Sequence, residues 1–357
     1  MPDGQHVEEQ PRHWSAFRQR LHRALPDDPQ FLRLLLIVVL LFVAFSLARP
    51  RIFPTVQNAQ SMARQSSELA ILTLAILLTM LSGGIDLSIV STANLSGIVA
   101  AFTLNALVPA GATGGEALGG IVGGVLAALA VGFAGGLFNG FLVAYVGITP
   151  ILATLGTLTL YQGLATVLSG GASVFGVPAF LFVGNGNALG IIPVPALIFI
   201  GIAILIAIIL KRTRYGLKLY MLGTNEKAAR FSGIDTTRIL LITYASSGLL
   251  SAVAGLIILG RNNAAAPDFG SSYILLAILI AVLGGVDPYG GYGEVLGVIL
   301  AVVAVQFLST GLNMVLFQYS GANFFRQFAW GALLLVILVV NYYFTHSKRD
   351  EVATVEE

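Results

Sequence analysis

The sequence predicts an all-α integral membrane protein, a polytopic bundle of about ten transmembrane helices with Gly-rich broken helices. Composition is the first reason: 56% of the residues are hydrophobic and 10% are charged, whereas soluble proteins carry roughly 25% charge. The 41 glycines are the second, because small residues allow close helix packing in lipid. The third is the arrangement of the apolar residues, which fall into runs long enough to cross a bilayer.

About ten apolar runs are expected to span the membrane, on length and hydropathy. In chain order they are Leu32–Ala48, Leu69–Leu81, Ile89–Leu107, Leu118–Val146, Ile151–Leu168, Pro195–Leu210, Ile239–Leu259, Tyr273–Leu283, Val295–Val315 and Phe328–Phe344. Tyr273–Leu283 is short and crosses only if it is tilted or flanked by buried loops. We therefore expect a transmembrane domain over residues 31–345 between polar tails at 1–30 and 346–357.

Glycine and proline mark the connections between these spans, and residues 52–66 are expected to form a polar connection. After the second span, Gly83 and Gly84 break the helix, and Asp86 or Ser88 caps the next one. The same Gly-Gly-apolar-Asp pattern recurs at 284–287. Internal repeats are common in transporters, although four matched positions in a glycine-rich chain are a weak signal.

One long polar segment, Leu222–Asp235, interrupts the apolar chain and predicts a short helix with both ends marked. Asn225 is a suitable N-cap, and Gly233 supplies the backbone freedom of a C-terminal stop. Glu226 and Arg230 are four residues apart, so they face each other on one side of the helix. The segment is either a solvated loop that is helical or a docking element for a soluble partner.

The basic residues orient the chain. Most of the 19 Lys and Arg residues lie in the N-terminal tail, in the region 211–238 or in the C-terminal tail, and a ten-span topology places all three on one side. Positive charge marks the cytoplasmic side of a membrane. Both termini and the polar segment are therefore expected in the cytoplasm. Five basic residues fall on the other side: Arg49, Arg51, Arg64, Arg261 and Arg326.

Several kinds of chemistry are excluded by what the sequence lacks. There is no cysteine, and the four histidines lie in the tails, so neither a metal site nor a catalytic triad can be assembled. The segment Gly223–Lys227 has the wrong spacing for a phosphate-binding loop. A net charge of +2 gives no indication of a nucleic-acid partner. The chain is thus not expected to be an enzyme.

Ion coupling is also not expected, because carboxylates kept inside a membrane mark ion pathways. The carboxylates near the spans all fall at predicted span ends or in loops: Glu68, Asp86, Glu116, Asp268, Asp287 and Glu294. Energy for transport must then come from another protein, and the capped polar helix offers a place for a separate ATPase to bind.

Three motifs carry a resemblance to a known family: Leu81-Ser82-Gly83-Gly84-Ile85-Asp86-Leu87-Ser88, the block Gly223–Ile234, and Leu283-Gly284-Gly285 with Gly290-Gly291-Tyr292-Gly293. Together they resemble the ribose/xylose/galactose-type permeases of bacterial ABC importers, over about residues 50–342. The block is the most specific of the three motifs, and the glycine loop alone is a weak one.

The resemblance implies a multi-pass permease subunit of the bacterial plasma membrane. Its expected partners are a second permease copy, two ATP-binding subunits that hold ATP and Mg²⁺, and a periplasmic sugar-binding protein. No cofactor is implied for this chain. The resemblance also implies that a coupling helix at about 225–232 docks in the ATPase; its candidate residues are Gly223, Asn225, Glu226, Ala228, Ala229, Arg230, Ser232 and Gly233.

Two departures from the family pattern bear on the solute and the pore. Ile274 and Leu276 stand where the family carries Glu and Asp, and the loop Gly284–Pro288 replaces a Gly-Gly-Thr-Ser loop. These departures leave open whether two identical permease chains or two different ones form the pore.

A small neutral solute such as a monosaccharide requires hydrogen-bonding groups and some apolar surface along its path. Polar residues within the predicted spans are the candidates: Asn94, Thr154, Thr157, Gln162, Gln306 and Asn313. Each is equally suited to a hydrogen bond between helices. The glycine pairs Gly83-Gly84 and Gly284-Gly285, with Asp86, are candidates for a structural or gating role.

Two other functions remain open at this point. A permease of the related branched-chain amino-acid class requires a charged partner in the path, and the sequence shows none. A stand-alone facilitator or channel would transport without an ATPase and would make the capped polar helix superfluous.

Overall fold

A computed structural model describes residues 29–109, 111–112 and 115–317, together with 325, 328, 330–332 and 335. Its helices in chain order are α2 (Pro29–Ala48), α3 (Val56–Leu81), α4 (Ile89–Leu107), α5 (Gly115–Phe141), α6 (Pro150–Ser169), α7 (Leu181–Asn185), α8 (Val194–Arg212), α9 (Arg214–Thr224), α10 (Glu226–Phe231), α11 (Thr236–Asn262), α12 (Tyr273–Leu283) and α13 (Val295–Leu316). The predicted tails and most of the span Phe328–Phe344 lie outside the described residues.

Eight helices in the described part of the chain are long and apolar enough to cross a membrane, and α12 is a shorter apolar helix. The all-α membrane architecture is therefore confirmed. Two short antiparallel pairs add the little β-structure described: β1 (Val174–Phe175) pairs with β4 (Ala264–Ala265), and β2 (Asn187–Ala188) pairs with β3 (Ile192–Pro193).

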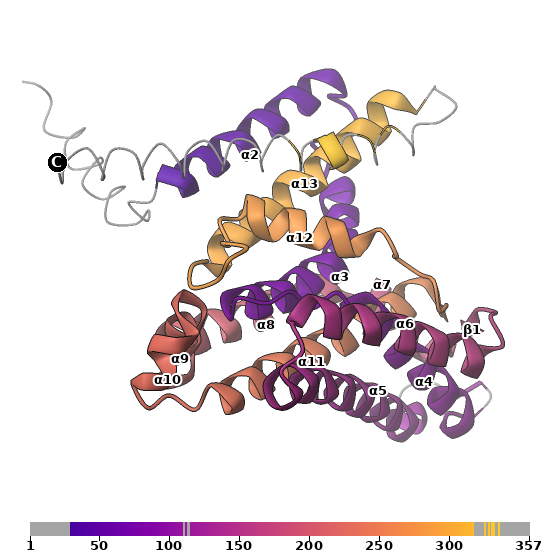
Figure 1. The fold of residues 1–357 in the computed structure, drawn as a ribbon. Coiled ribbons are helices and arrows are strands. Elements are labelled where there is room, and N and C mark those ends of the chain that lie inside the picture. The colour runs from indigo at the N-terminus through magenta and orange to yellow at the C-terminus, as the bar shows by residue number, and fades with distance from the viewer. Residues whose placement is uncertain are drawn as a thin grey trace, which may run out of the picture.

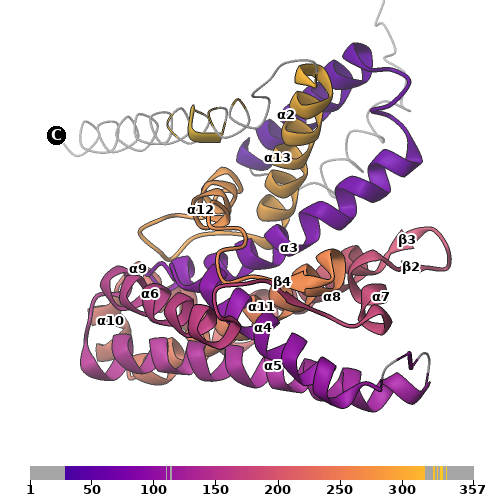
Figure 2. The same ribbon diagram turned by 90° about the vertical axis from the view of Figure 1, so that its right-hand side faces the viewer.

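The helices form a body and an arm (Figures 1 and 2). In the body, α11 packs against α3, α4 and α5, and α4 also packs against α6. The arm consists of α2, α12 and α13, and α3 packs against both parts. Consequently α3 is the main connection between the arm and the body, with smaller contacts from α12 to α4 and from α13 to α8.

Glycine allows the closest helix contact in the body, which lies between α5 and α11. A Cβ atom on Gly132 would overlap the carbonyl oxygen of Gly248, and one on Gly136 would overlap that of Tyr244. The expectation that glycine serves close helix packing is confirmed here, because the two backbones touch directly.

The prediction of a polar connection over 52–66 is wrong, because α3 already begins at Val56. The Thr55 side chain accepts a hydrogen bond from the amide of Asn58 and caps this helix. As a result Glu68 lies within α3 and its side chain is fully buried, which corrects its placement at a span end. The sequence did not predict the helix α9 either, because the charged residues of this segment are typical of a loop.

Candidate functional site

The short helix α10 forms as its sequence predicts. Asn225 Oδ1 accepts a hydrogen bond of 3.0 Å from the amide of Ala228, so the N-cap is made. Arg230 Nη2 lies 3.4 Å from Glu226 Oε1, which is the expected pair across one helical turn. The helix ends at Phe231. Gly233 follows with a φ of +78°, which suits glycine, and the amide of Ile234 donates to the carbonyl of Ala229.

Most of α10 faces outward. Ala229 is buried, whereas Glu226, Lys227, Ala228 and Arg230 are exposed. Phe231, at the end of the helix, is 92% exposed. Sequence reasoning missed Phe231, although a lone aromatic residue inside a charged segment was a usable signal. Large aromatic side chains are common anchors of protein interfaces. The exposed Phe231 side chain therefore makes α10 a candidate docking element.

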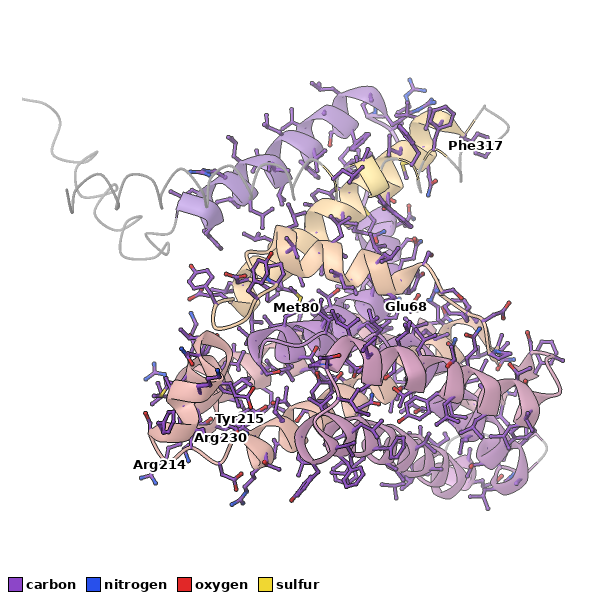
Figure 3. All side chains as sticks on the ribbon, in the orientation of Figure 1. Glu68, Met80, Arg214, Tyr215, Arg230 and Phe317 are labelled. Atoms are coloured by element: carbon purple, nitrogen blue, oxygen red, sulfur yellow. The ribbon has the colours of Figure 1, made fainter. Side chains whose placement is uncertain are left out.

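The preceding helix α9 anchors α10 to the spans. The Tyr215 hydroxyl lies 2.8 Å from Oγ1 of Thr243 on α11, and the Tyr220 hydroxyl donates to the carbonyl of Gly293 at 2.7 Å. Burial raises the pKa of both tyrosines to about 12, so the hydroxyls stay protonated at neutral pH. Figure 3 shows Arg214, Tyr215 and Arg230 gathered at this end of the molecule.

Between α3 and α4, the break at Ser82–Ser88 holds a buried carboxylate. Asp86 Oδ1 accepts hydrogen bonds from the Ser88 amide and hydroxyl, at 2.9 and 2.7 Å. Its Oδ2 accepts from the hydroxyl of Ser247 on α11 at 2.8 Å, and Asn139 on α5 approaches Oδ1 at 3.4 Å. Asp86 therefore joins three helices rather than simply capping α4, and Ser88 makes no side-chain cap.

The two Gly-Gly-apolar-Asp motifs adopt the same backbone conformation at the ends of their helices. However, the positions that correspond in the structure are shifted by one residue from those that match in the sequence. Gly83 after α3 and Gly285 after α12 have φ values of +82° and +89°. The next residues, Gly84 and Val286, both donate to the carbonyl five positions earlier. Gly83 thus corresponds to Gly285 and not to Gly284. A gating role for these glycines stays a prediction.

Three of the six path candidates, Asn94, Thr154 and Thr157, are buried on neighbouring helices. Asn94 on α4 donates to the carbonyls of Pro267 and Phe269, and Thr154 on α6 donates to Ile85 and Pro150. The Thr157 hydroxyl donates to the Thr154 carbonyl. The bonds of Asn94 to the two carbonyls and of Thr154 to Ile85 hold helices and loops together. A role of the three residues in a solute path stays a prediction.

The other three candidates, Gln162, Gln306 and Asn313, are half-buried. Gln306 and Asn313 lie on α13 in the arm, and Gln306 donates to Thr310 one turn later. The structure therefore does not bring the six residues into one site within a single chain.

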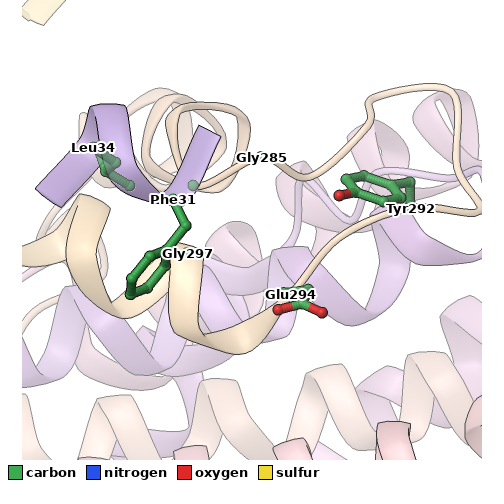
Figure 4. A pocket seen from close by; sticks show the side chains of 7 residues that line it. Phe31, Leu34, Gly285, Tyr292, Glu294 and Gly297 are labelled. Carbon is green, nitrogen blue, oxygen red and sulfur yellow. The ribbon is translucent and has the colours of Figure 1, made fainter. Parts of the chain in front are cut away.

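A pocket at the ends of α2 and α13 has a volume of only about 20 Å³ (Figure 4). It is lined by Phe31, Leu34, Gly284, Gly285, Tyr292, Glu294 and Gly297. A cavity of that size holds about one water molecule, whereas ligand pockets measure roughly 300–1,000 Å³. This pocket is too small for a sugar.

A second buried carboxylate, which the sequence reasoning did not single out, lies on α3. Glu68 is paired with Arg261 at the end of α11 through two bonds of 3.0 and 2.8 Å. The Tyr273 hydroxyl of α12 donates to the same carboxylate at 3.2 Å. This ion pair ties α3 to α11 and α12.

Comparison of the sequence with known proteins gives matches over most of the chain. The family model described as branched-chain amino acid transport system / permease component matches residues 58–340. The autoinducer 2 import system permease protein LsrD of Yersinia enterocolitica is 34% identical over 278 residues, which cover 76% of this chain and 79% of the relative. The LsrD proteins of Yersinia pseudotuberculosis and Yersinia pestis are 34% and 33% identical over the same lengths. No solved structure matches the chain.

Proposed function

This chain belongs to the family of branched-chain amino acid transport system permease components, and from that premise we propose that it works as the membrane-spanning subunit of an ABC importer. A separate subunit binds ATP and Mg²⁺ and docks on α10. A second permease chain completes the solute path, and an extracytoplasmic binding protein delivers the solute. Both termini and α10 face the cytoplasm of a bacterium.

The single observation that carries this proposal is the contrast between α10 and its surroundings. The helix is capped at both ends and exposed, while α9 beside it is bonded to α11 and to the segment before α13. Such a helix is a rigid element attached to the membrane-spanning helices. A partner that changes shape on ATP binding can move it as a unit, which is rigid-body switching.

The proposed solute is a small neutral molecule of the monosaccharide class, or a molecule like autoinducer 2, for which the Yersinia relatives are named. The six path candidates carry no charge, and a neutral solute needs hydrogen bonds rather than a counter-ion. An amino-acid solute is not favoured, since a zwitterion requires charged partners.

The docking of the ATPase is tested on Phe231. The Phe231→Ala variant is expected to reduce the amount of co-purified ATPase at least about tenfold, because a buried aromatic anchor typically contributes 2 kcal/mol or more to an interface. Phe317→Ala is the matched control: Phe317 is 84% exposed, lies at the end of α13, and is far from α10 in Figure 3.

The proposal predicts that Phe317→Ala retains the ATPase. Full retention by Phe231→Ala would contradict the docking of the ATPase on α10. The energy source is tested separately in liposomes: the chain alone is expected to accumulate no solute. Passage of the solute down its gradient through the chain alone would favour the facilitator, and accumulation against a gradient would require a driving force of the chain's own. Either result would end the proposal.

A further inference from the structure

Three segments far apart in the sequence meet backbone to backbone beside the α9–α10 turn. They are the end of α3 at Leu81 and Gly83, the end of α9 at Gly223, and the loop at Gly290 and Gly291. We call these five residues the glycine junction. The amide of Gly291 donates to the carbonyl of Leu81 at 3.2 Å, which fixes the first and third segments to each other.

Side chains are excluded from the junction by its geometry. A Cβ atom on Gly223 would overlap the carbonyl oxygen of Leu81 and lie 2.5 Å from the amide nitrogen of Gly291. A Cβ on Gly290 would lie 2.8 Å from the Cα of Gly83 and 2.9 Å from the carbonyl oxygen of Gly223. Each segment therefore touches the other two, and there is no room for a methyl group at Gly223 or Gly290.

Both sides of the junction are bonded onward. Gly223 is two residues before Asn225, the N-cap of α10. Gly83 opens the break that contains Asp86, whose carboxylate is bonded to Ser247 on α11. The carbonyl of Ile85 in the same break accepts the Thr154 hydroxyl of α6. The junction is thus one path from the docking helix to two helices of the body, α11 and α6.

The third segment is held to α9 and to α8 by side chains. The Tyr220 hydroxyl donates to the carbonyl of Gly293, and Lys211 at the end of α8 lies 3.0 Å from Glu294. The ion pair is exposed and screened by water, so the half-buried Tyr220 bond is the stronger of the two connections.

We propose that the glycine junction transmits the movement of α10 to the break before α4, and that Gly223 and Tyr220 are its positioning residues. The inference rests on the proposed function, since it requires an ATPase on α10. A backbone contact has no rotamers to absorb a displacement, whereas a side-chain contact does. Direct backbone contact therefore passes a shift of α10 to the spans with little loss.

The test is the number of solute molecules imported per ATP hydrolysed by the full complex in liposomes. In Gly223→Ala the added methyl group has no space, so it forces the three backbones apart. Gly223 lies near the end of α9, before α10, and packs against Leu81, so the variant does not alter the exposed face of α10. We expect the ATPase to remain bound and to hydrolyse ATP, while the import-to-hydrolysis ratio falls at least about tenfold. Gly201→Ala on α8 is the matched control: Gly201 is also helical, and nothing lies within 4 Å of an added Cβ.

Tyr220→Phe tests the same inference without adding volume, and it decides the matter where Gly223→Ala does not fold. Loss of this half-buried hydrogen bond is expected to lower the ratio about threefold to fivefold, with ATPase recovery unchanged. An unchanged ratio in either variant, with the ATPase still bound, would overturn the role of the junction. Failure of the wild-type chain to retain the ATPase would instead refute the docking of the ATPase on α10, and the inference with it.

Discussion

Two buried carboxylates, one within α3 and one in the break that follows it, are stabilised by different kinds of partner. Glu68, in the middle of the helix, is fully buried and is paired with Arg261. Asp86, in the break that follows the helix, is equally buried, yet within the described residues its hydrogen-bond donors are all neutral. In Figure 3, Glu68 and Met80 lie at different points along α3, and Met80 is the nearer of the two to α9 and α10.

We call the contacts around Glu68 the charged joint and the contacts around Asp86 the neutral joint. The charged joint is fixed, whereas the neutral joint is adjustable. The Glu68 carboxylate is fully buried, so opening its ion pair would leave its charge bare. Bonds from serine and asparagine are individually weaker, and a hydroxyl can reverse its direction at small cost. The joint beside the glycine junction is therefore the one built to rearrange, while the joint at Glu68 holds α3, α11 and α12 together.

The largest expected effect comes from breaking the charged joint. Glu68→Gln leaves the Arg261 guanidinium, which is 22% exposed, without its counter-charge. Removal of one member of a fully buried pair costs roughly 3–5 kcal/mol of folding free energy, and the partial exposure of Arg261 puts the expected loss at the lower end, about 3 kcal/mol. The measurement is reversible unfolding of the purified chain in mixed micelles. The double variant Glu68→Gln, Arg261→Gln is expected to recover at least half of the loss, because it removes both charges.

If Glu68→Gln were as stable as the wild type, the ion pair would contribute nothing and the contrast between the joints would disappear. A double variant no better than the single one would show that packing, not charge, carries the effect.

No sequence pattern could have found this ion pair, because Glu68 and Arg261 are 193 residues apart and each has an ordinary neighbourhood. The polar residues Gln57 and Asn58 concealed the start of α3, so Glu68 looked like a span end. By contrast, Ile89–Leu107 and Tyr273–Leu283 have the bounds that the sequence predicts, since hydropathy and glycine stops are local signals.

The second prediction concerns Asp86, where removal of charge is expected to be tolerated. In Asp86→Asn the oxygen still accepts from Ser88, and the new amide donates to a reversed Ser247 hydroxyl, so the cost is about 1 kcal/mol or less. Asp86→Ala leaves these polar groups without an acceptor and is expected to cost about 2–3 kcal/mol. The same unfolding assay measures both variants.

Asp86→Asn is also the matched control for Glu68→Gln, since each variant exchanges a carboxylate for its amide. Equal losses at the two positions would refute the distinction between a charged and a neutral joint.

The candidate site was predictable where its signals were local. Asn225 and Gly233 delimit α10 through capping rules, and the structure ends the helix at Phe231, close to the predicted 225–232. The candidates Gln306 and Asn313 depend on which face of α13 meets which neighbour, and composition does not determine that. Nor does any rule of sequence indicate that Leu81, Gly223 and Gly291 touch.

The smallest effects come from single hydroxyl groups, one at each joint. Ser247 donates to Asp86 at 2.8 Å, and Tyr273 donates to Glu68 at 3.2 Å. Because Asp86 has only neutral donors, Ser247→Ala is expected to cost about 1 kcal/mol. Glu68 keeps its guanidinium, so Tyr273→Phe is expected to cost about 0.6 kcal/mol, the average for a hydrogen bond between membrane helices. Unfolding of the two variants side by side tests the order, and a larger loss in Tyr273→Phe would mean that the charged joint depends on its neutral donor as well.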